Sequence, residues 1–350
     1  MPSMPDTFPA MRRDRPSTRA RITRALLLVL GTALLGYLAA RLGFRQIVSM
    51  LADLKWTFLP VLLLYAGHQA LRAAALGFCL PRRGTVAYAD LLAVRLSGEA
   101  VQFLTFSGPV LAEPMKAWLL RKRGLTTWEG LAATLAEYLA SSMMAAAMAI
   151  VGLAYVLIVI EPTGGVRIAT LAVLSGMVVF AGAFVVGISA RLHIIGAFVR
   201  LAARLPWLRE RLQHRLEGVG EAEDLLIHVL RDSPRRLWTI LGIEAAGQAC
   251  LGLELFCLIA ALHPSSDLGQ AMLIEGATKF ITAGYFFVPG QVGVAEGTYA
   301  VIFNTFAIPA AAGFAVSFVR RVRSVLTATI GLSALSRSTR LSEGSTPARS

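Results

Sequence analysis

Residues 128–160 read WEGLAATLAEYLASSMMAAAMAIVGLAYVLIVI, and this stretch decides the class of fold. From Tyr138 onward it contains no charged side chain. A helix rises about 1.5 Å per residue, so about 20 consecutive apolar residues cross the hydrocarbon core of a bilayer. Apolar runs of about 10–14 residues are typical of buried helices in soluble domains. The stretch therefore predicts a transmembrane helix.

The composition of the whole chain agrees with this prediction. Of the 350 residues, 56% are hydrophobic and 16% are charged, and the mean hydropathy is +0.63. Soluble domains carry about 25% charged residues. We expect six full spans, at residues 25–43, 56–80, 128–160, 167–190, 237–262 and 311–335.

The net charge of +13 has two explanations. Lys and Arg collect in the cytoplasmic loops of membrane proteins, and they also attract anionic lipid headgroups. We favour the first explanation. The basic residues are scattered between the apolar segments, which argues against nucleic acid as a partner. Cys79, Cys250 and Cys257 lie inside apolar runs and show neither a disulfide pattern nor metal-ligand spacing, so no metal site and no cofactor are expected.

Two further apolar segments, 86–123 and 268–307, are interrupted in the middle. The first is broken at Gly108-Pro109, and the second at Pro289-Gly290, with Gly293 close behind. Each half is short for a full span. Irregular backbone at membrane depth is tolerated only where protein or a wet cavity covers it. We therefore expect two re-entrant helical hairpins whose breaks meet near the bilayer midplane.

The distribution of basic residues predicts the topology. Lys116, Arg121, Lys122 and Arg123 follow the first hairpin and Arg82 and Arg83 precede it, so this hairpin should enter and leave from the cytoplasm. The second hairpin is flanked by 263–267 and 307–310, which hold no Lys or Arg, so it should dip in from outside. We expect basic cytoplasmic tails at 1–24 and 336–350 and a cytoplasmic loop at 191–236, which has interfacial helices.

The two halves of the chain also resemble each other faintly. A shift of 180 residues lays Pro109 on Pro289, and a shift of 183 lays Glu113 on Glu296. The predicted fold is an all-α polytopic membrane protein with an inverted repeat, in which each half has three transmembrane helices plus one re-entrant hairpin. Repeat 1 covers 25–160 and repeat 2 covers 167–335. Such repeats with discontinuous helices are typical of transporters.

Charged residues inside the predicted membrane segments are the candidate site, because charge at that depth is costly and tends to mark function. The candidates for a substrate pathway are Arg95, Glu99, Glu113, Glu137, Glu275, Lys279, Glu296, Arg320 and Arg323.

A structural and a functional explanation of these charges remain open. In the first, Arg95/Glu99 and Glu275/Lys279 are i,i+4 pairs, and Glu137 pairs with Arg320. In the second, the charges line a hydrated cavity for a polar headgroup. Three neighbouring arginines, at 320, 321 and 323, exceed the obvious acidic partners, and arginine suits phosphate.

The spacing of the three arginines predicts their directions. A helix turns about 100° per residue, so Arg320 and Arg323 should share a face with Glu296 in the cavity, and Arg321 should point elsewhere and matter less. Several other polar residues should be hydrogen-bond partners between helices. They are His68, Gln69, Arg72, Glu244, Gln248 and Glu254.

Residues 287–297, FVPGQVGVAEG, are followed by Ile308-Pro309 and by FVRRVR at 318–323. This pattern resembles the C-terminal signature of the lysylphosphatidylglycerol synthase transmembrane, or flippase-like, family, and most closely a branch associated with hopanoid biosynthesis. Gly108-Pro109, Glu113 and Glu137 resemble its other half, although Lys116 stands near the family's Arg and Tyr138 replaces the Arg of Glu-Arg-Leu. The similarity covers about residues 25–335.

The resemblance implies translocation or handling of a lipid at the bacterial inner membrane. We expect a flippase-like carrier of a phospho-, glyco- or hopanoid lipid, without enzymatic activity, because the chain shows no Walker A, H-E-x-x-H or G-x-S-x-G motif and no separate synthase domain. The main alternative is a noncatalytic scaffold or accessory subunit that binds lipid-biosynthesis enzymes. A membrane-embedded lipid-modifying enzyme is the third.

Overall fold

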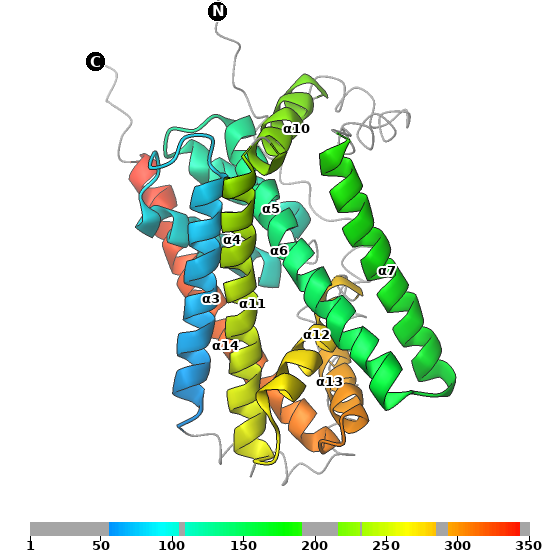
Figure 1. The fold of residues 1–350 in the computed structure, drawn as a ribbon. Coiled ribbons are helices and arrows are strands. Elements are labelled where there is room, and N and C mark those ends of the chain that lie inside the picture. The colour runs from blue at the N-terminus through cyan, green and yellow to red at the C-terminus, as the bar shows by residue number, and fades with distance from the viewer. Residues whose placement is uncertain (1–55, 105–108, 191–215, 232, 285–292, 344–350) are drawn as a thin grey trace, which may run out of the picture.

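A computed structural model describes residues 56–104, 109–190, 216–231, 233–284 and 293–343, and the regular elements in these ranges are all helices (Figure 1). In chain order they are α3 (Phe58–Cys79), α4 (Tyr88–Leu104), α5 (Pro109–Arg121), α6 (Thr127–Tyr155), the π-helical turn η1 (Val156–Ile160), α7 (Gly164–Ser189), α10 (Leu216–Arg231), α11 (Pro234–Leu262), α12 (Leu268–Gly284), α13 (Val294–Thr305) and α14 (Ala310–Glu343).

Four of the described helical stretches are long and apolar enough to cross a membrane: Phe58–Cys79, Thr127–Ile160, Gly164–Gly187 and Pro234–Leu262. They correspond to four of the six predicted spans, and they confirm an α-helical polytopic membrane protein. The predicted span at 25–43 lies outside the described residues. The span predicted at 311–335 lies within the single helix α14, whose three arginines, at 320, 321 and 323, lower its hydropathy.

Local sequence fixes where α6 begins. Gly124, at φ 95°, turns the chain after α5, in a conformation that only glycine adopts without strain. Thr126 and Glu129 then form a capping box, in which Thr126 Oγ1 accepts from the amide of Glu129 and Glu129 Oε2 accepts from the amide of Thr126. These bonds satisfy two amides that no helical carbonyl could reach.

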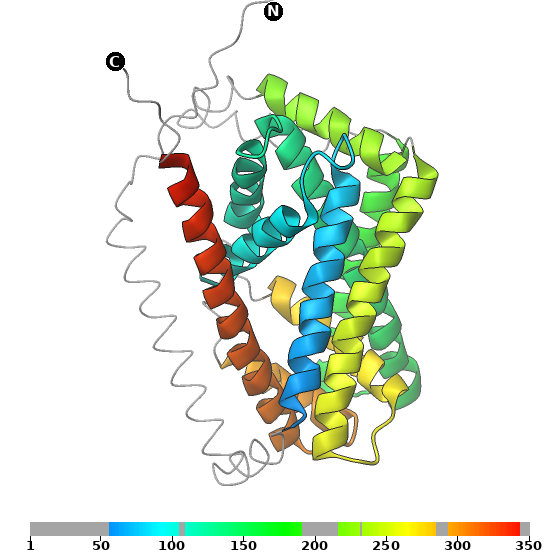
Figure 2. The ribbon, with the colours of Figure 1, turned by 90° about the vertical axis from the view of Figure 1, so that its left-hand side faces the viewer.

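The long helices form an oblique bundle. Helices α3 and α11 lie side by side, and α14 crosses behind them (Figures 1 and 2). The short helices pack against the long ones in a regular pattern: α4 on α14, α12 on α6, α5 on α6, and α13 on α14. Figure 2 shows α4 and α5 toward the upper end of the bundle, while α13 lies at the lower end.

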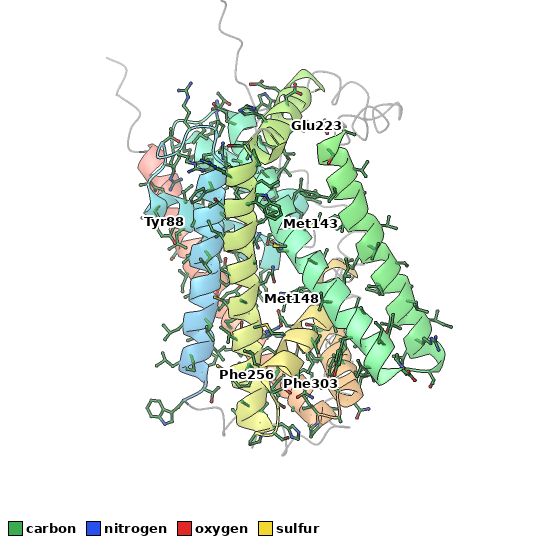
Figure 3. All side chains as sticks on the ribbon, viewed as in Figure 1. Tyr88, Met143, Met148, Glu223, Phe256 and Phe303 are labelled. Atoms are coloured by element: carbon green, nitrogen blue, oxygen red, sulfur yellow. The ribbon has the colours of Figure 1, made fainter. Side chains whose placement is uncertain are left out.

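Two apolar cores hold this arrangement together. One is built around α3, α4, α5 and α6 and includes Leu76, Val94 and Leu120, and α10 closes its end. The other is built around α11 to α14 and includes Leu255 and Phe303. Helix α7 contributes little to either core, because only 6% of its most apolar window is buried, and its side chains project outward (Figure 3).

Several helices touch backbone to backbone at glycines. A Cβ on Gly152 of α6 would lie 2.6 Å from the carbonyl oxygen of Leu273 on α12, and a Cβ on Gly276 of α12 would collide with the carbonyl of Met148 on α6. Likewise, a Cβ on Gly331 of α14 would collide with the carbonyl of Leu96 on α4. Small residues at such crossings are typical of membrane helix packing.

The predicted hairpin breaks fall partly on described residues. Gly108, Pro289 and Gly290 lie outside them, whereas Pro109 is the first residue of α5. Gly293 precedes α13 with φ 79°, a left-handed conformation that favours glycine. A full span needs about 20 residues. The four short helices have fewer: 17 in α4, 13 in α5, 17 in α12 and 12 in α13.

Candidate functional site

Charged side chains are gathered between the helices in two groups. The first charge cluster comprises Arg72, Arg95, Glu99, Glu113, Lys116, Glu137 and Glu244. The second charge cluster comprises Glu254, Glu275, Lys279, Glu296, Arg320, Arg321 and Arg323, with Tyr299. Every residue predicted for a substrate pathway belongs to one of the two.

Glu137 lies at the centre of the first charge cluster and is fully buried. Arg72 of α3 donates to it through Nε over 2.7 Å, and Lys116 of α5 donates to its other oxygen over 3.1 Å. Lys116 also lies 2.8 Å from Glu113, one helical turn back on α5. On α4, Arg95 pairs with Glu99 at 2.9 Å. Two cations thus hold one carboxylate from two different helices.

Gly98 makes room for this arrangement. A Cβ at Gly98 of α4 would lie 2.7 Å from Cδ of Lys116, so a larger residue would push the lysine stem away. The stem lies against α4 at Gly98, and the ammonium group reaches Glu137 on α6. The glycine therefore positions a fully buried charge.

Arg320 lies at the centre of the second charge cluster. Its guanidinium contacts Glu275 of α12 at 2.7 Å and Glu254 of α11 at 3.3 Å, and it donates to the hydroxyl of Tyr299 on α13 over 2.6 Å. Arg323, one turn further along α14, also binds Glu254. Helix α14 is thereby tied to α11 and α12 by ion pairs and to α13 by a hydrogen bond.

The remaining members of this cluster complete the pairing. Lys279 lies 2.7 Å from Glu275 on the same helix. Arg321 binds Oε1 of Glu296, while Oε2 of Glu296 accepts from the amide of Gly293 over 2.8 Å. Glu296 thus caps α13, where a negative charge suits the positive end of the helix dipole, and it also anchors α13 to α14.

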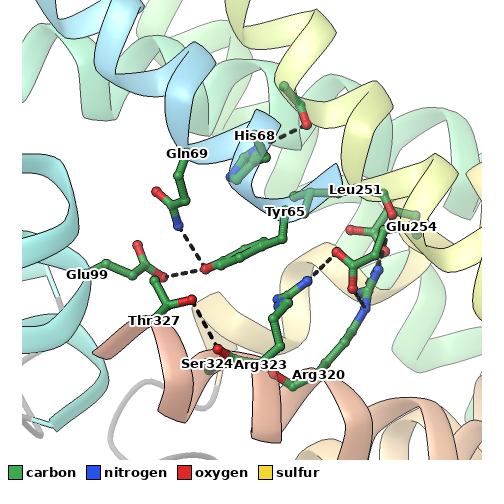
Figure 4. Close-up of polar contacts among 12 residues, drawn as sticks. Tyr65, His68, Gln69, Glu99, Leu251, Glu254, Arg320, Arg323, Ser324 and Thr327 are labelled. Carbon is green, nitrogen blue, oxygen red and sulfur yellow. Dashed lines mark hydrogen bonds and ion pairs between the residues drawn. The ribbon is translucent and has the colours of Figure 1, made fainter. Parts of the chain in front are cut away.

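Tyr65 of α3 joins the two clusters (Figure 4). Its hydroxyl donates to Glu99 of the first cluster over 3.2 Å and accepts from Gln69 over 2.8 Å. The guanidinium of Arg323, in the second cluster, lies 3.6 Å from the centre of the Tyr65 ring. A cation over an aromatic face is attracted by the ring quadrupole, so the tyrosine contacts both clusters with favourable geometry.

In the second charge cluster the acids are more deeply buried than the bases. Glu254 and Glu296 are fully buried, and Glu275 is 3% exposed. Arg321 and Lys279, by contrast, are 18% and 15% exposed, so these basic side chains are partly accessible. In the second cluster an incoming anion would therefore meet cations before it meets acids.

The structure bears out some of the predicted pairs and corrects others. Arg95/Glu99 and Glu275/Lys279 form the expected i,i+4 pairs. The predicted pair of Glu137 with Arg320 is wrong. Glu137 is occupied by Arg72 and Lys116, while Arg320 binds Glu254 and Glu275, because partners on adjacent helices lie closer.

The prediction for the three arginines also needs correction. Glu296 pairs with Arg321 and not with Arg320 or Arg323, because α13 packs on the side of α14 from which Arg321 projects. The arginines do not exceed their acidic partners either. Glu254, Glu275 and Glu296 come from three different helices. The spacing of residues along the chain does not show that these helices meet around α14.

Sequence reasoning gave four important members a lesser role. Arg72, Glu244 and Glu254 were expected to be hydrogen-bond partners only, and Lys116 was treated as a flanking charge. A signal for two of them existed, because a shift of 182 residues lays Arg72 on Glu254 with opposite sign. Nothing in the sequence marked Tyr65.

No group of three or more His, Cys, Asp or Glu side chains suitable for a metal ion occurs among the described residues. Six of the seven acids of the two clusters are instead held by arginine or lysine.

Apolar helices around buried ion pairs define the class of this chain, a polytopic α-helical membrane protein with a charged interior. The family model described as lysylphosphatidylglycerol synthase TM region matches residues 24–331, and the chain belongs to that family. A search of the curated proteins and a search of the solved structures each found no match.

Proposed function

We propose that this protein is a flippase-like carrier that moves an amphipathic lipid with an anionic headgroup across the bacterial inner membrane, and that it is not an enzyme. The lipid would be a phospho-, glyco- or hopanoid lipid. The observation that carries the proposal is the second charge cluster, in which basic side chains are partly exposed while their acidic partners are buried. Membership of a family named for lipid chemistry agrees with it.

The proposal includes the inverted repeat. If the halves are equivalent, α4 corresponds to α12 and α6 to α14. The packing of α4 on α14 and of α12 on α6 is then the same contact made twice, as is the packing of α5 on α6 and of α13 on α14. The glycine contacts show the same equivalence between the halves. Gly276 of α12 lies against Met148 of α6, and at the equivalent positions Leu96 of α4 lies against Gly331 of α14. This pattern supports two inverted halves.

The ion pairs support the same correspondence between the halves, with acidic and basic residues interchanged. The Arg72–Glu137 pair of the first half corresponds to Glu254–Arg320 of the second. In the same way, Arg95–Glu99 corresponds to Glu275–Lys279. In this proposal α4–α5 and α12–α13 are re-entrant hairpins that enter from opposite sides.

The mechanism follows from exchange of ion-pair partners. A lipid phosphate that reaches Lys279 or Arg320 can replace Glu275 on the cation, because phosphate offers arginine the same two-point contact as carboxylate. The displaced Glu275 keeps its second cation, so the exchange avoids leaving a buried charge unpaired, which costs about 3–5 kcal/mol. The headgroup could thus enter the protein while the lipid tails stay in the bilayer.

The alternative function is a scaffold for enzymes of lipid biosynthesis. Helix α10 favours it, because Ala222 and Leu226 face the bundle while Glu221 and Asp224 face outward at one end of it. A scaffold has no need for charges buried between its helices, however, and their desolvation is costly. We therefore rank the carrier first.

The test is lipid translocation in reconstituted vesicles. The probe is NBD-labelled phosphatidylglycerol, and dithionite bleaches the label that remains in the outer leaflet. We expect Arg320→Gln to slow translocation at least about tenfold, the effect of about 1.4 kcal/mol, and Arg320→Lys to retain part of the rate. Arg167→Gln, on the exposed face of α7, is the matched control. Equal rates in folded Arg320→Gln and wild type would contradict the carrier.

A further inference from the structure

Glu244 of α11 differs from the other carboxylates of the two charge clusters. It is fully buried, and neither of its oxygens has a hydrogen-bond partner in the described part of the chain. Its closest cation is Nε of Arg72, at 3.7 Å. The other six carboxylates each have a cationic nitrogen at 2.9 Å or closer.

Arg72 is already held by Glu137. Its Nη2 and Nε lie 2.5 and 2.7 Å from Oε1 of Glu137, so Glu244 receives only a long side contact. The remaining cations of the first charge cluster are occupied as well, Lys116 by Glu113 and Glu137, and Arg95 by Glu99. The cluster therefore holds four carboxyl groups against three cations, and Glu244 is the one in excess.

An ionised carboxylate without donors is strongly disfavoured in a buried site, whereas a neutral carboxyl group needs only an acceptor for its O–H. Ser141 of α6 lies beside Glu244, although no hydrogen bond of normal length and angle joins the two. A small rotation would let its hydroxyl oxygen accept a proton from Glu244.

We propose that Glu244 is a proton-binding site. Its carboxyl group holds a proton while Arg72 is bound to Glu137, and it releases that proton to water when Arg72 turns to Glu244. The guanidinium then pairs with the new carboxylate, and Glu137 keeps Lys116 as its partner. One proton leaves for each such exchange, and Glu113 and Glu137 then share the single cation Lys116.

Several groups on the packed helices act on this site. They are Arg72 from α3, Glu137 from α6 and Arg95 from α4. His68 of α3 lies one turn before Arg72, and its Nδ1 is 2.9 Å from the carbonyl oxygen of Gly247 on α11. A carbonyl only accepts, so Nδ1 carries a hydrogen and Nε2 is the nitrogen to which a proton would add. The test therefore has to separate His68 from Glu244.

The coupling of this proton to lipid movement rests on the proposed function. Glu137 corresponds in that proposal to Arg320, at which the lipid phosphate would bind. If the exchange of partners accompanies movement of the hairpins, a proton gradient drives transport in one direction.

Infrared difference spectroscopy of the purified protein tests the site without any lipid transport. Protonated carboxyl groups absorb apart from carboxylates and imidazole, so His68 does not interfere. Across about pH 5 to 9, where buried glutamates titrate, we expect one carboxylic band that disappears as the pH rises. Glu244→Gln should abolish it. The matched control Glu129→Gln keeps the capping box of α6 and should leave it unchanged.

A further variant tests the competition for Arg72. Glu137→Gln frees Arg72 for Glu244, so the band should vanish at lower pH than in wild type. A band that survives in Glu244→Gln overturns the proposal. So does a wild-type protein without a glutamic acid band at any pH, a result that ¹³C-glutamate labelling establishes without any variant.

The vesicle assay separates this inference from the proposed function. With NBD-phosphatidylglycerol, we expect a pH gradient to change the wild-type translocation rate and to leave the rate of Glu244→Gln unchanged. A titrating band in a protein that moves no lipid would refute the carrier and leave the proton site standing. An equal response of both proteins to the gradient would overturn the coupling.

Discussion

Arg72 on α3 donates to Glu137 on α6 across 65 residues of sequence, and the 2.7 Å contact joins two helices that cross the membrane. Glu137 is completely buried, and Arg72 is 13% exposed. A pair of this kind contributes modestly as long as it is intact, because desolvation offsets much of the attraction. Losing Arg72, however, leaves Glu137 and Glu113 to share Lys116, so one buried negative charge is uncompensated.

We therefore expect Arg72→Gln to destabilise the protein by about 3–5 kcal/mol, measured by titrating SDS into the detergent-solubilised protein. The double variant Arg72→Gln/Glu137→Gln should be more stable than Arg72→Gln alone. The control is Arg123→Gln, which breaks a partly exposed pair with Asp90 and should cost at most about 1 kcal/mol. Equal costs for Arg72→Gln and Arg123→Gln would show that the inner pair is well hydrated.

The glycine crossing between α12 and α6 gives a second prediction. Gly276→Ala places a methyl group against the carbonyl of Met148, and we expect it to cost about 1–3 kcal/mol, as overpacking does. Gly242→Ala on α11 is the matched control, because no atom of the described residues lies within 4 Å of the added methyl group. Alanine favours a helix over glycine by about 0.5–1 kcal/mol, so the control should be stabilised. A stable Gly276→Ala would mean that the helices separate easily.

Arg321 provides a third prediction, which reverses the expectation from helical spacing. Because it binds Glu296, the residue that caps α13, Arg321→Gln should lower thermal stability, and Glu296→Gln should lower it less, since glutamine can still cap the helix. The readout is the melting temperature in detergent. The prediction fails if Arg321→Gln melts like wild type.

The orientation in the membrane is a fourth prediction. In a background without Cys79, Cys250 and Cys257, a cysteine at Lys122 should react with a membrane-impermeant maleimide only from the cytoplasmic side. A cysteine at Ala307 should react only from the periplasmic side. Both positions are exposed at chain turns outside the long spans. Labelling of both from one side would refute the inverted halves.

The spans and the local ion pairs are the features that the sequence could predict. The spans followed from continuous apolar runs, because the bilayer imposes a length on any helix that crosses it. The local pairs Arg95/Glu99 and Glu275/Lys279 followed from the helical period. Both rules need only neighbouring residues.

The pairs between helices could not be predicted in the same way. Whether Glu137 meets Arg72 or Arg320 depends on which helices are adjacent and how they cross, and the sequence states neither. Arg321 and Glu296 illustrate the point, because the period correctly separated Arg321 from Arg320 but did not place α13 relative to α14. Glu244 was visible as a charge within a span, but its lack of a partner appears only when all its neighbours are placed.

The ion pairs of α14 also bear on how the protein is made. A charged residue at the centre of a helix adds about 2.5–3.5 kcal/mol to the free energy of insertion by the translocon, so Arg320, Arg321 and Arg323 make α14 a poor candidate for insertion by itself. Their partners Glu254, Glu275 and Glu296 all precede α14 in the chain and leave the ribosome first. The acids are thus already in the membrane when the arginines are synthesised. Helix α14 can therefore insert by forming ion pairs with helices that are already there.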